Sequence, residues 1–363
     1  GAFDGLLEEI TGGHQIALRK SGIAIGVAPV CGQIARGAGR ERRVPGGALF
    51  CHGASLSRLV HYVKGWNLAM PIRPDLLLHP RPEGLYCPAG DFYIDPLRSV
   101  ARALITHAHS DHARPGHGAV LATRETLDIM ALRLGEGFCE TRQIAPLGSS
   151  VAHHGVDIRF HPAGHVLGSA QIAVEYQGTR IVVSGDYKRT PDPTTPAFEP
   201  VPCDVFVTEA TFGLPVFTHP DPMGEISKLL ASLMRFPDRA HLLGAYSLGK
   251  AQRVIRLLRL AGHDAPIFLH GALEKVTAYY VSQGIDLGDL RKVVGVPPAE
   301  LGGRIILCPP GSLSDLWSRR FPDPVTAVAS GWMRIKARAR QNGAELPLVI
   351  SDHADWPELI RTL

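Results

Sequence analysis

Three histidines and an aspartate fall within six residues of this chain, directly after a short apolar run. The run 103–106 predicts a buried strand, and the segment H-A-H-S-D-H follows it at residues 107–112. Side chains alternate along an extended segment, so the first two histidines and the aspartate can point to one side, and a following turn can bring the last histidine to meet the aspartate. Such a density of imidazoles and carboxylates favours two neighbouring metal ions over a His-rich polar loop. The ligand candidates here are His107, His109, Asp111 and His112.

Two later residues have the character of further ligands, each at the end of a strand-like stretch. His165 lies in a loop between two such stretches, and Asp186 follows a β-branched run. Glycines beside both residues leave the backbone the room that such loops need. His161 competes with His165 for the ligand role, although a histidine beside a proline at a strand end is more often structural. The adjacent His153 and His154 are expected on the surface.

This series of motifs resembles that of the metallo-β-lactamase fold hydrolases. Asp95, at the end of the stretch 92–95, is similar to the early aspartate that braces the metal loop in that fold. Glu209 in 204–213 and His353 in 351–355 resemble the acidic motif and the late histidine motif of the β-CASP branch, which contains nucleic-acid-processing nucleases. The resemblance runs from about residue 70 to residue 363. Within the branch, the phrases at 86–91, 208–213 and 330–333 look most like the bacterial ligase-associated, Artemis-like DNA exonucleases.

The resemblance implies an α/β fold, a metallo-β-lactamase αββα sandwich with an inserted β-CASP α/β domain. Helical spacing in 223–236, followed by alternating strand-like and helix-like segments, favours a small parallel sheet in the insertion. We expect the first part of the metallo-β-lactamase domain at 70–211, the β-CASP domain at 212–345 and a return to the first domain at 346–363. Residues 1–69 show no sustained periodicity; they are either a small extension or residues upstream of a natural start at Met70, and we assign them no function.

Composition agrees with this reading without leading to it. The apolar content of 45% is typical of a soluble globular protein. None of the six cysteines forms a C-x-x-C pair, which argues against a zinc ribbon or a disulfide scaffold and favours a reducing cytoplasm. No apolar run approaches the roughly 20 residues of a membrane span, so we expect a cytoplasmic protein without a membrane partner. The net charge of +4 does not by itself indicate a nucleic-acid partner.

The chemistry implied by the resemblance needs two metal ions, zinc or alternatively manganese. One ion would be held by His107, His109 and His165, the other by Asp111 and His112, with Asp186 bridging. Two ions about 3.5–4 Å apart can stabilise the attacking and leaving oxygens of a phosphodiester. The catalytic candidates are His353, which would protonate the leaving oxygen, Glu209, which would orient His353 or a ligand, and Asp111. Asp352 and Asp355 are weaker candidates, more consistent with a helix cap and a surface acid.

The chain departs from the β-CASP pattern at its end. It stops at Leu363, ten residues after His353, and contains no Thr-His-Gly-like phrase to supply the last histidine of the second metal. We therefore expect either a lost C-terminus or a second metal with an open, weaker set of ligands.

Basic residues mark two candidate contacts with nucleic acid. Lys250 and Arg253 begin a predicted helix, where free N–H groups and cations can bind phosphate; the alternative is a solvated helix face. A second basic cluster precedes the late histidine and consists of Arg334, Lys336 and Arg338. Four aromatics could stack on bases, although core packing is the commoner role of such residues: Trp317, Trp332, Tyr279 and Tyr280.

The expected function is metal-dependent hydrolysis of DNA with single strands or free ends, by an exonuclease of DNA repair linked to a DNA ligase. An RNA-processing ribonuclease of the β-CASP branch is the alternative. A small-molecule hydrolase of the same fold would need neither the large insertion nor the motifs of Glu209 and His353. A non-catalytic nucleic-acid-binding relative would be expected to lack some of the ligands.

Overall fold

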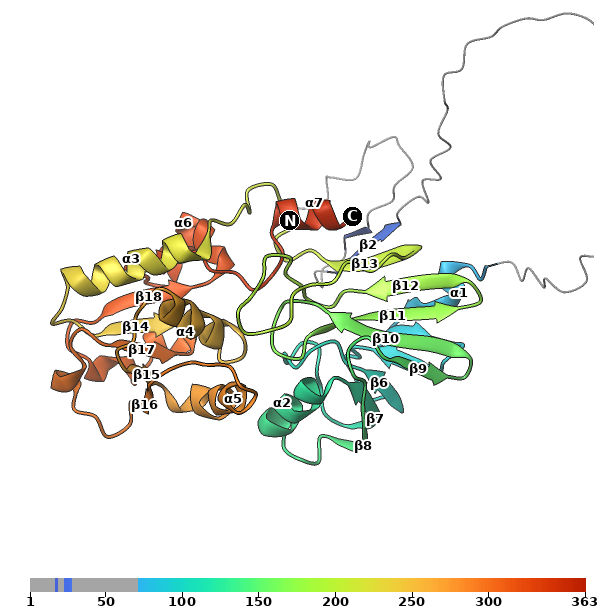
Figure 1. Cartoon of the computed structure of the whole chain (residues 1–363), viewed down its shortest axis with the longest axis horizontal. Coiled ribbons are helices and arrows are strands. Elements are labelled where there is room, and N and C mark those ends of the chain that lie inside the picture. Colours follow the sequence, from blue (N-terminus) through green and yellow to red (C-terminus); the bar gives the residue numbers. More distant parts are fainter. Residues whose placement is uncertain (1–16, 19–22, 28–70) are drawn as a thin grey trace, which may run out of the picture.

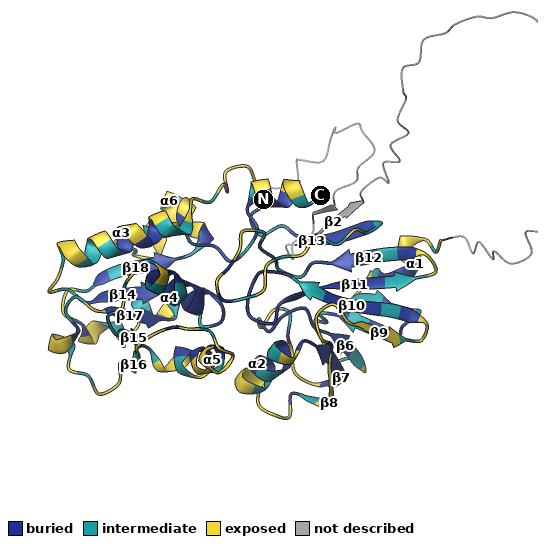
Figure 2. Ribbon diagram, in the orientation of Figure 1, coloured by how far each residue is buried: buried dark blue, intermediate teal, exposed yellow. Residues whose placement is uncertain are grey.

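The computed structural model describes residues 17–18, 23–27 and 71–363, which form two lobes side by side (Figure 1). The first lobe holds two β-sheets, and the second holds one sheet flanked by helices. Figure 2 shows that buried residues follow the strands through the middle of each lobe, while exposed residues gather on the outer helix faces. In the part of the chain that the structure describes, no helix combines the length and the apolar character needed to cross a membrane.

The first lobe consists of a six-stranded and a seven-stranded sheet. The six-stranded sheet has the order β3 (His79–Arg81), β4 (Gly84–Cys87), β5 (Phe92–Ile94), β6 (Arg102–Leu104), β7 (His117–Ala122), β8 (Cys139–Ile144). The seven-stranded sheet has the order β1 (Ala17–Leu18), β2 (Ile23–Val27), β13 (Val205–Glu209), β12 (Thr179–Val183), β11 (Ala170–Tyr176), β10 (Val156–Pro162), β9 (Ser150–His153). A short helix, α1 (Pro74–Leu77), lies between β2 and β3 in the chain.

Alternation of side chains along these strands produces four layers. Leu104 of β6 and Ile172 of β11 point into the core between the two sheets. Val120 of β7 points the other way, against helix α2 (Arg124–Leu134). On the far side of the seven-stranded sheet, Phe206 packs against Leu359 of helix α7 (Trp356–Thr362). The order helix, sheet, sheet, helix is the predicted αββα sandwich.

The second lobe is a parallel six-stranded sheet with helices, as the alternation of segments predicts. Its strand order is β16 (Leu290–Lys292), β15 (Ile267–Leu269), β17 (Ile305–Cys308), β14 (His241–Gly244), β18 (Val325–Ala329), β19 (Leu346–Leu348). Its α-helices are α3 (Pro222–Arg235), α4 (Lys250–Leu260), α5 (Gly271–Ser282) and α6 (Lys336–Gln341), and its 3-10 turns are η2 (Pro298–Leu301), η3 (Pro310–Leu313), η4 (Ser318–Arg320) and η5 (Gly331–Arg334).

Two boundaries differ from those expected. Residues 346–348, expected in the first domain, form β19 and pair with β18 in the second sheet, because three residues suffice for an edge strand and carry no signal of which sheet they join. Residues 23–27, to which the sequence assigned no role, form β2 and pair antiparallel with β13 of the first lobe. The rest of the segment 1–69, apart from the short strand β1, lies outside the described residues.

The two lobes share a continuous apolar core. Leu127 of α2 and Leu273 of α5 belong to the same buried cluster, although they come from different lobes. The hydroxyl of Tyr280, a fully buried residue of α5, accepts a hydrogen bond from the backbone N–H of Leu167 at 3.0 Å. Leu167 lies in the loop that carries His165, so this contact ties the second lobe to a loop of the candidate site.

Removing the Tyr280 hydroxyl leaves a buried N–H without its partner. We expect Tyr280→Phe to lower the free energy of unfolding in urea by about 1–3 kcal/mol. Tyr93→Phe is the control, because Tyr93 is a half-buried tyrosine on strand β5, remote in sequence from this contact. Equal stability of the two variants would contradict a structural role for the contact.

Candidate metal centre

The predicted ligands lie on loops at the ends of strands of both first-lobe sheets. The segment 107–112 follows β6, His165 lies between β10 and β11, and Asp186 follows β12. Gly185 immediately precedes Asp186 and has a positive φ of 53°; a Cβ there would meet the hydroxyl oxygen of Thr106 at 2.6 Å. Glycine therefore lets the Asp186 loop approach the segment 107–112 closely.

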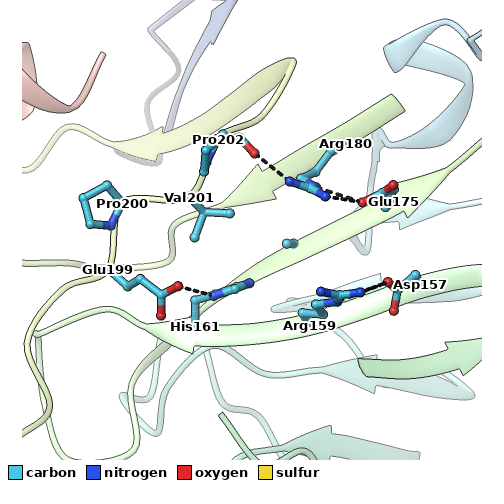
Figure 3. A pocket seen from close by; sticks show the side chains of 10 residues that line it. Asp157, Arg159, His161, Glu175, Arg180, Glu199, Pro200, Val201 and Pro202 are labelled. Carbon is cyan, nitrogen blue, oxygen red and sulfur yellow. Dashed lines mark hydrogen bonds and ion pairs between the residues drawn. The ribbon is translucent and has the colours of Figure 1, made fainter. Parts of the chain in front are cut away.

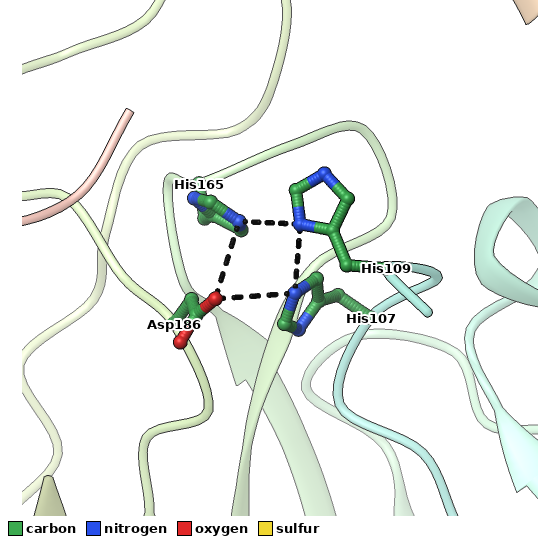
Figure 4. A group of neighbouring side chains, drawn as sticks. All are labelled: His107, His109, His165 and Asp186. Atoms are coloured by element: carbon green, nitrogen blue, oxygen red, sulfur yellow. Dashed lines mark hydrogen bonds and ion pairs between the residues drawn. The ribbon is translucent and has the colours of Figure 1, made fainter. Parts of the chain in front are cut away.

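Four side chains converge on one point, as Figure 4 shows: His107, His109, His165 and Asp186. Nδ1 of His109 lies 3.1 Å from Nε2 of His107 and 3.1 Å from Nε2 of His165. The carboxylate of Asp186 completes the set at 3.4 Å from His107 and 3.7 Å from His165. Three imidazole nitrogens and one carboxylate oxygen, all within 4.8 Å of one another, form a donor set that fits a transition-metal ion such as zinc.

Hydrogen bonds on the outer side of each ring leave the inner nitrogen free to bind a metal. Nδ1–H of His165 donates to the carbonyl of Asp352 at 2.8 Å, and Nε2–H of His109 donates to the carbonyl of Leu248 at 3.2 Å. A carbonyl can only accept, so these contacts fix the tautomers of both rings. His107 is turned in the same way, since its Nδ1 lies 3.1 Å from the hydroxyl of Thr106.

Burial keeps these imidazoles uncharged. It lowers the pKa of His107 and of His109, and it lowers the pKa of His165 to about 3. Neutral imidazole is the form that binds metal ions.

A second group of polar residues adjoins the first through Asp95. The carboxylate of Asp95 accepts hydrogen bonds from the backbone N–H of Thr106 at 2.8 Å, from the Thr106 hydroxyl at 2.6 Å and from Nδ1 of His112 at 2.7 Å. Nε2 of His112 lies 3.5 Å from the other oxygen of Asp186. The structure thus places Asp95 beneath the metal loop, as expected for a brace, and Asp186 between His112 and the first donor set.

Charge favours the protonated form of His112 when no metal is bound. Burial opposes that form, but the carboxylates of Asp95 and Asp186 outweigh it and raise the pKa of His112 to about 10. A metal ion would have to displace this proton. Asp111 remains largely outside the donor set: its side chain is 74% exposed, and its carboxylate lies 3.9 Å from His112.

The structure brings His353 and Glu209 together beside the donor set. Nδ1 of His353 donates to Glu209 at 2.9 Å and lies 3.9 Å from Asp186. The other carboxylate oxygen of Glu209 accepts from the backbone N–H of Tyr187 at 2.8 Å. Burial alone would lower the pKa of His353, but Glu209 and Asp186 raise it to about 9. Glu209 therefore orients the imidazole of His353 and favours its protonated form.

The predicted phosphate contacts of Lys250 and Arg253 are not supported, because α4 points both side chains into the protein. Lys250 is 3% exposed and forms an ion pair with Asp352. Arg253 is 1% exposed, donates to the carbonyl of Ser351 and lies 3.5 Å from Asp192. Both cations therefore hold the loop that carries His353.

The second basic cluster lies on the surface, whereas the two acids beside His353 are buried. Arg334, Lys336 and Arg338 lie on the surface, on η5 and α6, as a backbone contact would require. Asp355, expected as a surface acid, is buried and is the N-cap of α7. Asp352, expected as a helix cap, is buried and forms an ion pair with Lys250 instead.

The remaining histidine candidates lie away from the donor set. Nδ1–H of His161 donates to the carboxylate of Glu199 at 3.1 Å in a pocket of about 140 Å³ on the outer face of β10–β12, beside the ion pairs drawn in Figure 3. His165, not His161, is the histidine of this segment that joins the cluster. His153 and His154 stack on each other at the turn between β9 and β10, with ring centroids 4.1 Å apart.

Three contributors to the site were not found from the sequence. Thr106 links His107 to Asp95 through its hydroxyl. Leu248 supplies a carbonyl, and backbone atoms leave no trace in a motif. Lys188 is buried and lies 3.4 Å from Glu358 and 3.5 Å from the carbonyl of His353. Of the three, only Thr106 had a signal, a hydroxyl directly before the first ligand.

The sequence is similar to those of several known proteins. A probable DNA ligase from Opitutus terrae is 31% identical over 290 residues, which are 77% of this chain and 27% of that protein. Cleavage and polyadenylation specificity factor subunit 3 of Dictyostelium discoideum is 31% identical over 34% of this chain and 17% of its own length. An RNase J-like protein of Methanocaldococcus jannaschii is 24% identical over 51% of each chain. No protein-family model matches the sequence.

The fold is that of the metallo-β-lactamases with an inserted β-CASP domain. The four-layer first lobe, the parallel sheet that interrupts it and the similarity to the RNase J-like protein agree on this, and the predicted fold class is confirmed. The chain spans about a quarter to a half of the length of the ligase and the RNase J-like protein.

The outer hydrogen bond of His107 can be tested through Thr106. We expect Thr106→Val, which keeps the shape but removes the hydroxyl, to weaken zinc binding about 10–100-fold, because the ring loses the partner that fixes its tautomer. A competition titration with a chromophoric chelator measures the affinity. Thr106→Ser should restore it and His161→Ala should leave it unchanged, whereas His109→Ala should remove a ligand outright. Unaltered zinc affinity in Thr106→Val would contradict a role of Thr106 in orienting His107.

The burial of Lys250 predicts a large cost of removing its charge. Lys250→Met removes the ammonium group that pairs with the buried Asp352, and we expect it to lower the free energy of unfolding by about 3–5 kcal/mol. The matched control is Arg256→Met on the same helix, whose partner Asp286 is exposed; its expected cost is about 0–1 kcal/mol. Urea denaturation measures both. If the two variants lose equal stability, Lys250 does not hold the loop.

Proposed function

We propose that this chain is a metal-dependent nuclease that hydrolyses phosphodiester bonds of DNA. The observation that carries the proposal is that three histidines, with their inner nitrogens free, converge with one aspartate beside a second pair of residues. The first group is His107, His109, His165 and Asp186, and the pair is His353 and Glu209. No small-molecule hydrolase of this fold would need that second pair.

The metal is proposed to be zinc, because three imidazoles and a carboxylate are typical zinc ligands; manganese is the alternative. Residues His107, His109 and His165 would hold one ion, Asp111 and His112 a second, and Asp186 would touch both. Bound ions of this kind supply a Lewis acid that polarises a phosphodiester and stabilises its developing charge. Asp111 would have to turn inward from its exposed position to take part.

His353 would act as the general acid on the leaving oxygen. Its Nδ1–H donates to Glu209, so Nε2 is the nitrogen left to hold and deliver a proton. Glu209 is in turn held by the N–H of Tyr187, and the loop of His353 is held by Lys250 and Arg253. These contacts support the proposed role, because they hold the imidazole in one orientation before substrate binds.

DNA is proposed over RNA because a similarity that covers 77% of this chain is to a probable DNA ligase. The same similarity supports an exonuclease of DNA repair with a functional link to a ligase. The similarities to the cleavage and polyadenylation factor and to the RNase J-like protein support RNA processing, which is the second candidate.

Cleavage of end-labelled single-stranded DNA and RNA of matched sequence tests the proposal. With zinc or manganese added, we expect trimming of DNA, and a loss of about 10²–10⁴ in rate in His353→Ala, which removes the general acid. Asp186→Asn should abolish cleavage, and Glu209→Gln should slow it by misorienting His353. His161→Ala is the matched control and should retain full activity.

Each outcome decides a separate point. RNA cleaved as fast as DNA, or faster, overturns the DNA preference and leaves the nuclease. Metal-loaded protein that cleaves neither polymer overturns the nuclease. Full activity in His353→Ala overturns the role of that residue.

A further inference from the structure

Two large aromatic side chains are exposed where the second sheet meets the metal centre. Tyr246 is 61% exposed and Trp332 is 39% exposed. They follow the carboxyl ends of β14 and β18, neighbouring parallel strands whose register pairs Gly244 with Val328. Carboxyl ends of parallel strands lie at one edge of a sheet, and that edge is where such folds bind ligands.

This edge adjoins the metal centre through two contacts. Leu248, two residues after Tyr246, places its carbonyl 3.2 Å from His109. Phe212, in the loop after β13, lies between Trp332 and His353, with its ring centroid 5.0 Å from the indole and 6.1 Å from the imidazole. A nucleotide on either aromatic would therefore be a near neighbour of one whose phosphate lies in the centre.

Trp332 is held in place although it is exposed. Its ring packs on Phe212 and, edge to face at 5.2 Å, on Phe217. Its backbone N–H donates to the hydroxyl of Ser330 at 3.3 Å. Gly331 permits this packing, because a Cβ there would meet the ring of Phe212 at 2.5 Å. A fixed aromatic surface loses little entropy when a base stacks on it.

Exposed cations lie next to the ring of Trp332 and along the surface beyond it. Arg334, Lys336 and Arg338 are exposed, and the guanidinium of Arg338 lies 5.8 Å from the centre of the Trp332 ring, the outer limit of a cation–π contact. An aromatic ring flanked by exposed cations matches what single-stranded nucleic acid presents, a base with a phosphate on each side. The aromatics Tyr280, Tyr279 and Trp317 do not offer this, since Tyr280 is fully buried and the other two are partly buried.

We propose that Trp332, together with Tyr246 after the neighbouring strand, is a stacking platform for bases of single-stranded nucleic acid that enters the metal centre. The inference rests on the proposed nuclease function and adds to it a substrate form, unpaired bases, and the residues that read it. Stacking is tolerant of sequence, so the platform positions the strand without selecting a base. Trp332 is a positioning residue: it acts on the substrate next to the reacting phosphate and not on the reaction itself.

The test measures binding without cleavage. Fluorescence anisotropy of a labelled oligothymidylate, with the full chain in EDTA, should show binding about tenfold weaker in Trp332→Ala than in the unaltered protein, and within about threefold in Trp332→Phe. Met234→Ala is the control, an exposed apolar residue of α3 near the opposite edge of the sheet. Arg338→Gln should instead reduce the salt dependence of binding, which Trp332→Ala should leave unchanged.

An oligonucleotide with abasic sites distinguishes stacking from other contacts. The unaltered protein should bind it about tenfold more weakly than oligothymidylate, and this difference should be clearly smaller in Trp332→Ala, which retains only Tyr246 for stacking. In the cleavage assay, Trp332→Ala should raise KM with kcat nearly unchanged, because uniform binding is lost and the chemistry is not.

The possible failures are distinguishable. If the unaltered protein cleaves nucleic acid and Trp332→Ala binds it equally well, the platform is wrong and the nuclease stands. Equal binding of abasic and normal strands also overturns it, and points to an apolar contact with a protein partner as the use of this surface. If the unaltered protein neither binds nor cleaves DNA or RNA, the proposed function fails and the platform with it.

Discussion

The orientation of three buried imidazoles is the constraint on which the rest of this site depends. Each ring of His107, His109 and His165 makes an outer contact with an oxygen and turns its other nitrogen inward. Without those outer acceptors, any ring could protonate or turn its inner nitrogen, and the inner nitrogens would no longer present lone pairs to one point. Burial adds a second condition, because it disfavours the charged rings that would repel a cation.

The outer acceptors come from three distant parts of the chain, which makes the site a product of both lobes. Thr106 belongs to the first lobe, Leu248 to the second, and Asp352 to the segment that returns from the second lobe to α7. The inserted lobe is therefore part of the metal centre and not a lid added to a finished one. The shared apolar core and the contact of Tyr280 with Leu167 keep the two lobes in the register that these carbonyls need.

Features that depend on a few adjacent residues could be predicted from the sequence, whereas features that depend on tertiary contacts could not. The helical spacing of 223–236 agrees with α3, and the apolar run 103–106 overlaps β6, because both patterns are complete within a few residues. The donor set could be anticipated because its residue types are rare in such spacing. The inward turn of Lys250 could not, because a cation at the start of a helix has the same sequence signature on the surface and in the interior. Likewise, nothing in the segment 330–333 indicates that Trp332 is exposed while the neighbouring Met333 is buried.

The cations beneath the loop of His353 raise the question of why charges are buried there at all. Lys250 with Asp352, Arg253 with Asp192 and Lys188 with Glu358 are three buried pairs, and apolar residues of equal size would often stabilise a fold as well or better. Apolar residues could not, however, bond the carbonyls of this loop. Arg253 and Lys188 contact the carbonyls of Ser351 and His353, while the carbonyl between them, that of Asp352, is left to accept from His165. We infer that these pairs set the conformation of the loop, because they fix the direction of its successive peptide groups. One loop can then both orient a metal ligand and carry the acid that would act beside it.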